Sequence, residues 1–297
     1  MPKTSRPIII LFGVVCMLFW GMSFVWSKVV FNYYSPLTTI FLRLVISGII
    51  LLVIRALWIK STPFENKDIP MIMASAFFSP FCYFLGESYG LQEVSSTVAA
   101  VIIATIPVFS PFVAYITLKE RLTTLNFLGL IVSFIGIVVM LVRKDLSMDG
   151  SLKGILLLFF AVVAALAYSV SIKRLSTKYH PLTIVAYQNV LGAVYFLPFF
   201  LLLDWKHFIH VVPNLELTYS LLALAIFASS LAFILFTIVL REIGMSRANI
   251  YSNLIPVFTA IFSFFVLSEQ FTPAKLAGMI IVISGVVLAQ SGKLRSS

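Results

Sequence analysis

The chain carries little charge. Asp, Glu, Lys and Arg make up 11% of its 297 residues, whereas 61% of the residues are hydrophobic. A water-soluble protein of this length needs more charged side chains to cover its surface, so the composition excludes a soluble globular protein. The two cysteines, Cys16 and Cys82, both lie inside apolar runs, which excludes a disulfide framework.

The sequence also lacks the short motifs of common enzymes. It has no Gly-x-Ser-x-Gly and no Gly-rich phosphate-binding loop, and its three histidines lack the spacing of metal ligands. We therefore expect no enzyme activity, no cofactor and no metal. Without a phosphate-binding loop we expect no ATP-driven pumping either, so any transport must draw on a gradient or an exchange.

Long apolar runs dominate what is present. Each is long enough, at about 20 residues, to cross roughly 30 Å of hydrocarbon as a helix. They do not alternate as barrel strands do, so we expect helices. The first run lacks a small-x-small cleavage site and is expected to remain a helix rather than a signal peptide. The runs predict an all-α membrane protein with ten transmembrane helices, at 8–27, 37–58, 70–91, 95–118, 124–142, 153–172, 182–203, 217–240, 246–267 and 273–290.

The basic residues sort by side of the membrane. With a cytoplasmic N-terminus, 14 of the 21 Lys and Arg fall on the cytoplasmic side, six fall on the outer side, and Arg43 lies within a span. This bias predicts that both termini lie in the cytoplasm, and we expect the membrane to be the plasma (inner) membrane. The same bias accounts for the net charge of +10, so the charge does not indicate nucleic-acid binding. We expect a small-molecule solute and membrane lipid as partners, and no nucleic acid. The sequence leaves open whether the protein forms a homodimer.

Two segments 149 residues apart are similar. Residues 106–139 share 11 of 34 positions with 255–288, including Ile-Pro-Val-Phe at the start of both. A repeat at half the chain length indicates a duplicated module, which predicts a first five-helix repeat at 1–144 and a second at 145–297.

Five spans per half is an odd number, so the second copy enters the membrane from the opposite side. This predicts an inverted-topology repeat, in which Glu120 lies on the cytoplasmic side of the membrane and its counterpart Glu269 lies on the outer side. Two related bundles packed in this way have two arrangements of nearly equal energy, which alternating access requires.

Across its whole length the chain resembles the drug/metabolite transporter superfamily, in its EamA-type branch. The resemblance rests on the five-plus-five layout, the Gly-spaced fifth and tenth spans, and several short motifs. These are Leu-x-Glu at 118–120 and 267–269, the small-residue-to-Pro runs Ser96 to Pro107 and Ser246 to Pro256, and Trp20-Gly21 with Lys28. The resemblance implies a ten-helix carrier of small organic solutes, often an exporter, and does not identify the cargo.

Arg43 is the most informative single residue. It lies seven residues after Pro36, about 10 Å deep at about 1.5 Å per residue. Placing Arg there costs roughly 2.5–3.5 kcal/mol even on the gentlest scale, so it should face the bundle or water. It either binds a carboxylate or phosphate of the cargo, or snorkels to headgroups or makes a fixed ion pair. Gln188 takes its place in the second half.

Glu87 is the expected partner of Arg43, because the two lie in the same leaflet. Tyr83 shares its helix face. A carboxylate that loses Arg43 to an arriving substrate can take up a proton, which makes Glu87 a candidate coupling residue. The alternative is a permanent structural pair or a wetted interfacial carboxylate.

Two prolines and two asparagines within the spans are further candidate site residues. Pro107 and Pro256 interrupt corresponding helices, and such paired breaks point to a substrate site or gate near the midplane, or are kinks without function. Asn249 and Asn253 share one polar face of the ninth span, which either lines a cavity or bonds to another helix.

These features predict a secondary transporter of small polar or amphipathic metabolites that works by alternating access, with efflux as the expected direction. Amino-acid-like solutes are favoured because Arg43 and Glu87 could meet a carboxylate and an amine. The alternatives are uptake of a nucleoside- or vitamin-like solute stacked on aromatic rings, a passive channel, and a membrane scaffold. The expected substrate-binding residues are Trp20, Ser23, Arg43, Tyr83, Tyr168, Gln188, Asn249 and Asn253.

Overall fold

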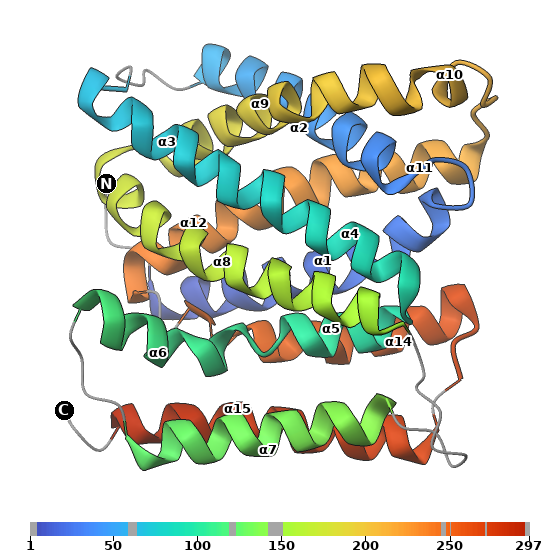
Figure 1. Ribbon diagram of the computed structural model, residues 1–297. Coiled ribbons are helices and arrows are strands. Elements are labelled where there is room, and N and C mark those ends of the chain that lie inside the picture. Colours follow the sequence, from blue (N-terminus) through green and yellow to red (C-terminus); the bar gives the residue numbers. More distant parts are fainter. Residues whose placement is uncertain are drawn as a thin grey trace.

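The computed structural model describes residues 5–58, 64–118, 123–141, 151–244, 248–249, 251–270 and 272–294. Within these ranges the chain is helical and contains no strand (Figure 1), so the predicted all-α class is confirmed. The helices are α1 (Arg6–Val30), α2 (Pro36–Trp58), α3 (Ile69–Ala76), α4 (Tyr83–Glu93), α5 (Ser96–Ile103), α6 (Ile106–Leu118), α7 (Thr124–Leu141), α8 (Leu152–Lys178), α9 (Pro181–Phe199), α10 (Trp205–Phe208), α11 (Leu215–Ala223), α12 (Ala232–Ile243), α14 (Ile255–Leu267) and α15 (Pro273–Leu294).

Many of these helices are long and apolar enough to cross a membrane. Seven such stretches occur in the described ranges: Arg6–Val30, Pro36–Trp58, Asn66–Glu93, Ser96–Val113, Leu152–Lys178, Pro181–Phe208 and Leu215–Ile243. Shorter apolar helices cover Phe127–Val139, Tyr251–Leu267 and Pro273–Leu288. The predicted boundary between the halves, after residue 144, and Glu120 lie outside the described residues.

Local sequence explains where several helices begin. Proline has no backbone N–H and is therefore favoured in the first turn of a helix, where N–H groups lack a partner within the helix. The first turns of α1 and α9 both contain a proline. Ser151 and Asn214 cap α8 and α11, because their side-chain oxygens accept hydrogen bonds from the backbone N–H groups of Gly154 and Leu217.

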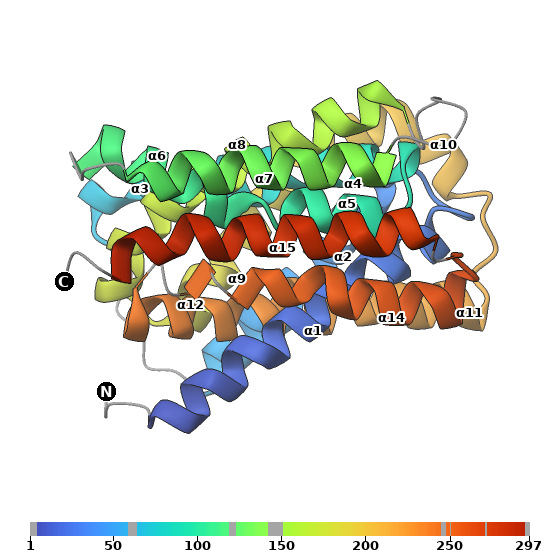
Figure 2. The same cartoon turned by 90° about the horizontal axis from the view of Figure 1, so that it is seen from below.

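Each long helix packs chiefly against helices of the other half of the chain. α2 lies along α9, α4 along α8, and α1 along α12 and α14 (Figures 1 and 2). α7 and α15 form a separate antiparallel pair at one side of the bundle. Their backbones touch: a Cβ on Gly136 would lie 2.7 Å from the carbonyl oxygen of Gly278, so no side chain fits there.

Several spans are interrupted. Ser79 has extended backbone angles within the π-helical segment Phe77–Cys82, between α3 and α4. A second π-helical segment, Leu224–Leu231, separates α11 from α12, and a third covers Phe200–Asp204. Such segments release backbone groups from the regular ladder and are frequent at functional sites.

α1 begins and α15 ends at the same end of the bundle (Figure 1). There Lys178 Nζ lies 2.8 Å from the Glu65 carboxylate and 2.5 Å from the Asp68 carboxylate. The hydrogen bond from Lys178, and to a smaller extent the one from Lys67, lowers the pKa of Glu65. The contact between Glu65 and Lys178 therefore persists when the pH falls below the ordinary pKa of a glutamate. At the other end the Tyr33 hydroxyl donates to Glu216 at 2.9 Å. Both contacts join the two halves.

Candidate functional site

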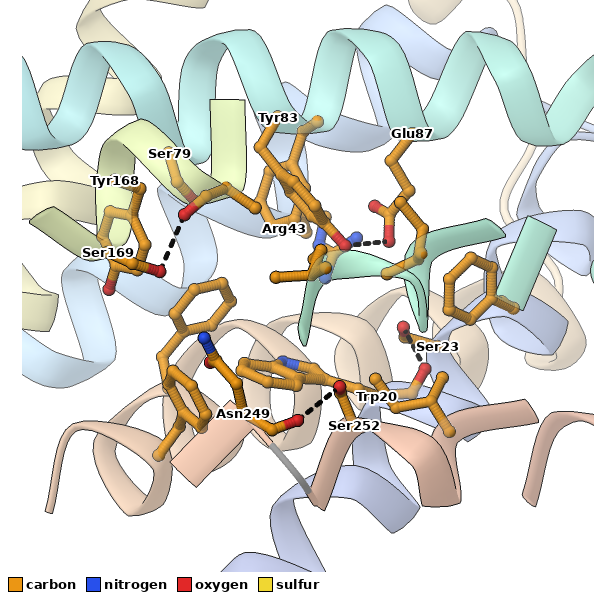
Figure 3. A pocket seen from close by; sticks show the side chains of 18 residues that line it. Trp20, Ser23, Arg43, Ser79, Tyr83, Glu87, Tyr168, Ser169, Asn249 and Ser252 are labelled. Carbon is orange, nitrogen blue, oxygen red and sulfur yellow. Dashed lines mark hydrogen bonds between the residues drawn. The ribbon is translucent and has the colours of Figure 1, made fainter. Parts of the chain in front are cut away.

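A cavity lies between helices of both halves (Figure 3). The space between its walls is about 700 Å³, a figure that includes the part open to the outside. Its walls are mostly aromatic and aliphatic, with a few polar groups. The lining residues are Trp20, Ser23, Phe24, Arg43, Ser79, Tyr83, Phe84, Glu87, Ile103, Ile106, Ala165, Tyr168, Ser169, Phe233, Phe236, Asn249, Ser252 and Ile255.

Aromatic rings form one wall of the cavity. Trp20 of α1 packs edge-on to Phe233 at 5.2 Å and tilted against Phe236 at 5.0 Å. The Trp20 indole N–H donates to the carbonyl oxygen of Ala228, in the π-helical segment before α12, at 3.3 Å. Tyr168 of α8 also lies edge-on to Phe233, with the ring centroids 6.5 Å apart. Residues from α1, α8 and α12 thus give the cavity an apolar wall.

Arg43 of α2 is 2% exposed, and its charge lies against the cavity. Its Nε–H donates to the Ser229 hydroxyl at 2.7 Å, and its Cζ lies 4.3 Å from the centroid of the Phe84 ring. The two terminal nitrogens have no hydrogen-bond partner within the described parts of the chain. A buried cation with unpaired donors is costly, so this edge of the guanidinium is suited to an incoming anion.

Glu87 of α4 faces the same cavity and is 7% exposed. Its carboxylate accepts a hydrogen bond from the Tyr83 hydroxyl at 3.1 Å (Figure 3). Arg43 and Glu87, both described, form no ion pair within 4.0 Å, although their charges are close enough to interact. The expected direct pairing is therefore absent from this structure.

The far end of the cavity is formed by the residues that precede α14. Asn249 donates to the Ser110 hydroxyl of α6 at 3.2 Å, and Ser252 donates to the carbonyl oxygen of Asn249 at 2.6 Å. The side chain of Asn249 thus both lines the cavity and joins helices of the two halves. The two interpretations of this polar face are not exclusive.

Seven of the predicted residues line the cavity: Trp20, Ser23, Arg43, Tyr83, Glu87, Tyr168 and Asn249. Gln188 does not; its amide nitrogen donates to the Ser75 hydroxyl at 2.5 Å. Asn253 is also outside the lining, and its Oδ1 is buried without a hydrogen-bond partner in the described ranges.

Pro107 and Pro256 lie outside the lining as well. Each is the second residue of a helix, α6 or α14, and the helical break comes just before it. Residues 104–105 form a turn before α6, and the 3-10 segment Tyr251–Leu254 precedes α14. The prolines therefore mark where the chain resumes a helix after the break.

Sequence reasoning missed several lining residues. Phe84, Phe233 and Phe236 are aromatic residues in spans that are rich in them, so composition does not single them out. Ser79 reaches the cavity because the helix is broken at that residue. The one local signal was Pro80, which follows it inside a predicted span.

One end of the bundle is held by a carboxylate from the second half. Glu269 accepts hydrogen bonds from the Ser96 N–H at 2.8 Å, the Thr97 N–H at 3.4 Å and the Thr97 hydroxyl at 2.9 Å. Ser268 ends α14 in the left-handed conformation, with φ 54°, and so turns Glu269 toward the start of α5. We name this contact of Glu269 with Ser96 and Thr97 the Glu269 clasp.

The comparisons with known proteins cover most of the chain and agree with one another. The model of the EamA-like transporter family matches residues 7–142 and again residues 152–290. An uncharacterized transporter of Archaeoglobus fulgidus is 29% identical over 91% of this chain and 94% of that protein. The uncharacterized transporter YoaV of Bacillus subtilis is 25% identical, over 94% and 96%. A crystal structure aligns with a TM-score of 0.71 at 16% identity, covering 96% of this chain and 99% of that one, which shows the fold alone.

Proposed function

The chain belongs to the EamA-like transporter family, and we propose that it is a secondary transporter that exports small amino-acid-like solutes by alternating access. Its apolar helices place it in a membrane. The finer proposal is a plasma membrane protein of ten spans, arranged as two inverted repeats, with both termini in the cytoplasm. Two separate matches to the family model, one in each half, support the duplication.

The observation that carries the proposed solute class is the pair of charges in one cavity. The terminal N–H groups of Arg43 are unpaired and suit a carboxylate, and Glu87 offers a carboxylate to an ammonium group. The aromatic wall around Trp20 suits an apolar side chain. An amino acid combines these three features. Efflux is proposed from the family resemblance.

The test is counterflow in liposomes that contain the purified protein. We expect saturable exchange of zwitterionic amino acids and little exchange of the matching amines, which lack the carboxylate. Arg43→Gln should lower carboxylate exchange about 10- to 100-fold, the effect of losing charge-assisted hydrogen bonds in a buried site. Arg55→Gln is the matched control, because Arg55 lies on the same helix and outside the cavity lining.

Several outcomes would contradict the proposal. Unchanged exchange in Arg43→Gln would remove the role of the guanidinium. Linear, unsaturable flux would indicate a channel, and no flux of any solute would indicate a scaffold. Preference for nucleosides over amino acids would overturn the solute class. Metabolite profiling of cells with and without the protein tests the direction, since an exporter raises the extracellular level of its solute.

A further inference from the structure

A network of buried polar side chains is hydrogen-bonded to Arg43 through Ser229. Ser229 accepts the Arg43 Nε–H at 2.7 Å and is fully buried. It belongs to the π-helical segment Leu224–Leu231, between α11 and α12. Ser229 is not among the residues that line the cavity, whereas Arg43 is.

Neighbouring residues hold Ser229 in place. Asn189 of α9 donates to the carbonyl oxygen of Ser229 at 2.9 Å and to the Ser47 hydroxyl at 2.5 Å. The hydroxyls of Ser47 and Ser230 lie 2.6 Å apart, and Ser230 donates to the carbonyl oxygen of Ala225 at 2.8 Å. All of these side chains are buried, so water does not compete for their hydrogen bonds. The segment that carries Ser229 is thereby fixed to α2 and α9.

These contacts restrict the guanidinium to few orientations. Ser229 occupies the Nε edge, and the Phe84 ring lies 4.3 Å from Cζ. A guanidinium is planar, so when its Nε edge is held the terminal N–H groups form the remaining hydrogen-bonding edge. Those groups have no partner among the residues that the structure describes, and Arg43 lines the cavity beside Tyr83 and Glu87 (Figure 3).

The equivalent position in the second half is arranged differently. Gln188 corresponds to Arg43, is neutral, and directs its amide nitrogen to Ser75 rather than to the cavity. The two related positions therefore do not give two equivalent binding groups. This leaves Arg43 with an unpaired cationic edge that its counterpart lacks.

We propose that Ser229 is the residue that positions Arg43, so that the terminal edge of the guanidinium grips a carboxylate with two parallel hydrogen bonds. This inference rests on the proposed function and adds the device that selects carboxylate-bearing solutes over neutral or purely cationic ones. Ser229 acts through Arg43 and does not touch the solute. Without its hydroxyl the guanidinium can rotate, and the paired contacts are replaced by a single weaker one.

The test compares two ligands that differ only in the carboxylate. Each of the twenty amino acids is first screened by thermal stabilisation of the purified wild-type protein. The Kd of the best stabiliser and of its decarboxylated amine are then measured for wild type, Ser229→Ala and Ser229→Thr. We expect Ser229→Ala to raise the Kd of the amino acid about ten-fold or more and to leave that of the amine unchanged. Ser229→Thr should restore the wild-type value, because it retains the hydroxyl.

Ser133→Ala is the matched control, since Ser133 is an equally buried serine in α7 outside the cavity lining. If Ser229→Ala does not fold, Ser229→Cys, which keeps a weaker acceptor, takes its place in the same comparison. An equal loss of affinity for both ligands, or an unchanged amino-acid Kd in a folded variant, would overturn the positioning role alone. A folded wild type that binds none of the twenty amino acids would overturn the proposed solute class and this inference with it.

Discussion

At the scale of single residues, Arg43 and Glu87 show that depth in a membrane helix determines which leaflet a residue lies in, but not which side chain it contacts. The rise of a helix fixes how far each residue lies along its axis, so both were expected in the same leaflet. Their lateral separation depends on packing and on the break at Ser79, which helps to set the direction of α4. Both face one cavity, but the Glu87 carboxylate is bonded to Tyr83 instead of to Arg43.

This arrangement leads to a prediction for Glu87. If its carboxylate takes up a proton during transport, the rate should vary with pH in wild type, because the ratio of protonated to ionised form changes about ten-fold per pH unit. Glu87→Gln is expected to abolish that dependence while the protein remains folded. Transport measured in liposomes across a series of pH values provides the check.

Glu93→Gln is the control for this experiment, because Glu93 lies on the same helix and pairs with Lys153 at the surface. It should leave the pH profile unchanged. A Glu87→Gln variant whose pH profile matches that of wild type would show that another group carries the coupling.

At the scale of the elements, apolar run length predicted the helices well and their interruptions poorly. A run such as 70–91 reads as one continuous span, yet the backbone breaks at Ser79. π-Helical segments depend on packing and on side chains inserted from neighbours, which hydrophobicity along one segment does not report. Ser229 escaped notice for the same reason, since it lies in an apolar run whose π-helical turn aims it at Arg43.

The Glu269 clasp allows a prediction about opening. Its three hydrogen bonds join the end of α14 to the start of α5, so it closes the bundle between the halves at one end. Glu269→Gln removes the negative charge that favours the start of α5, an effect worth about 0.3–1 kcal/mol at a helix terminus. We expect a cysteine placed at Ser23 to react about two- to five-fold faster with a water-soluble thiol reagent in that variant.

Glu216→Gln serves as the comparison, because Glu216 is an exposed carboxylate at the same end, bonded to Tyr33. It should leave the labelling rate at position 23 near the wild-type value. Equal acceleration in both variants would mean that any lost carboxylate loosens this end, and that the clasp has no special part in opening.

At the scale of the whole molecule, composition and run length were the strongest guides. Few charges and long apolar runs were sufficient to predict a helical membrane protein, because lipid allows few other backbone arrangements. The repeat cannot reveal which helices touch, since that depends on how two related surfaces meet in space. The structure shows that most large contacts cross between the halves, such as α2 with α9 and α7 with α15.

The proposed orientation can be tested in intact cells. Lys67 lies just before α3, at the end of the bundle where α1 begins and α15 ends, and Val212 lies between α10 and α11 at the other end; both are exposed. A membrane-impermeant thiol reagent should label Val212→Cys and not Lys67→Cys, and permeabilisation should expose the latter. Labelling of both in unbroken cells, or the reverse pattern, would contradict cytoplasmic termini.

The contact between α7 and α15 has a consequence for biogenesis. Residues are added in order, so α7 emerges from the ribosome well before Pro273 begins its partner. Until then the surface of α7 around Gly136 lacks the backbone of α15 that packs against it in the finished structure. The final fit between these two backbones is therefore made after synthesis is nearly finished. A nascent chain cut short before α15 would leave that surface of α7 without its partner.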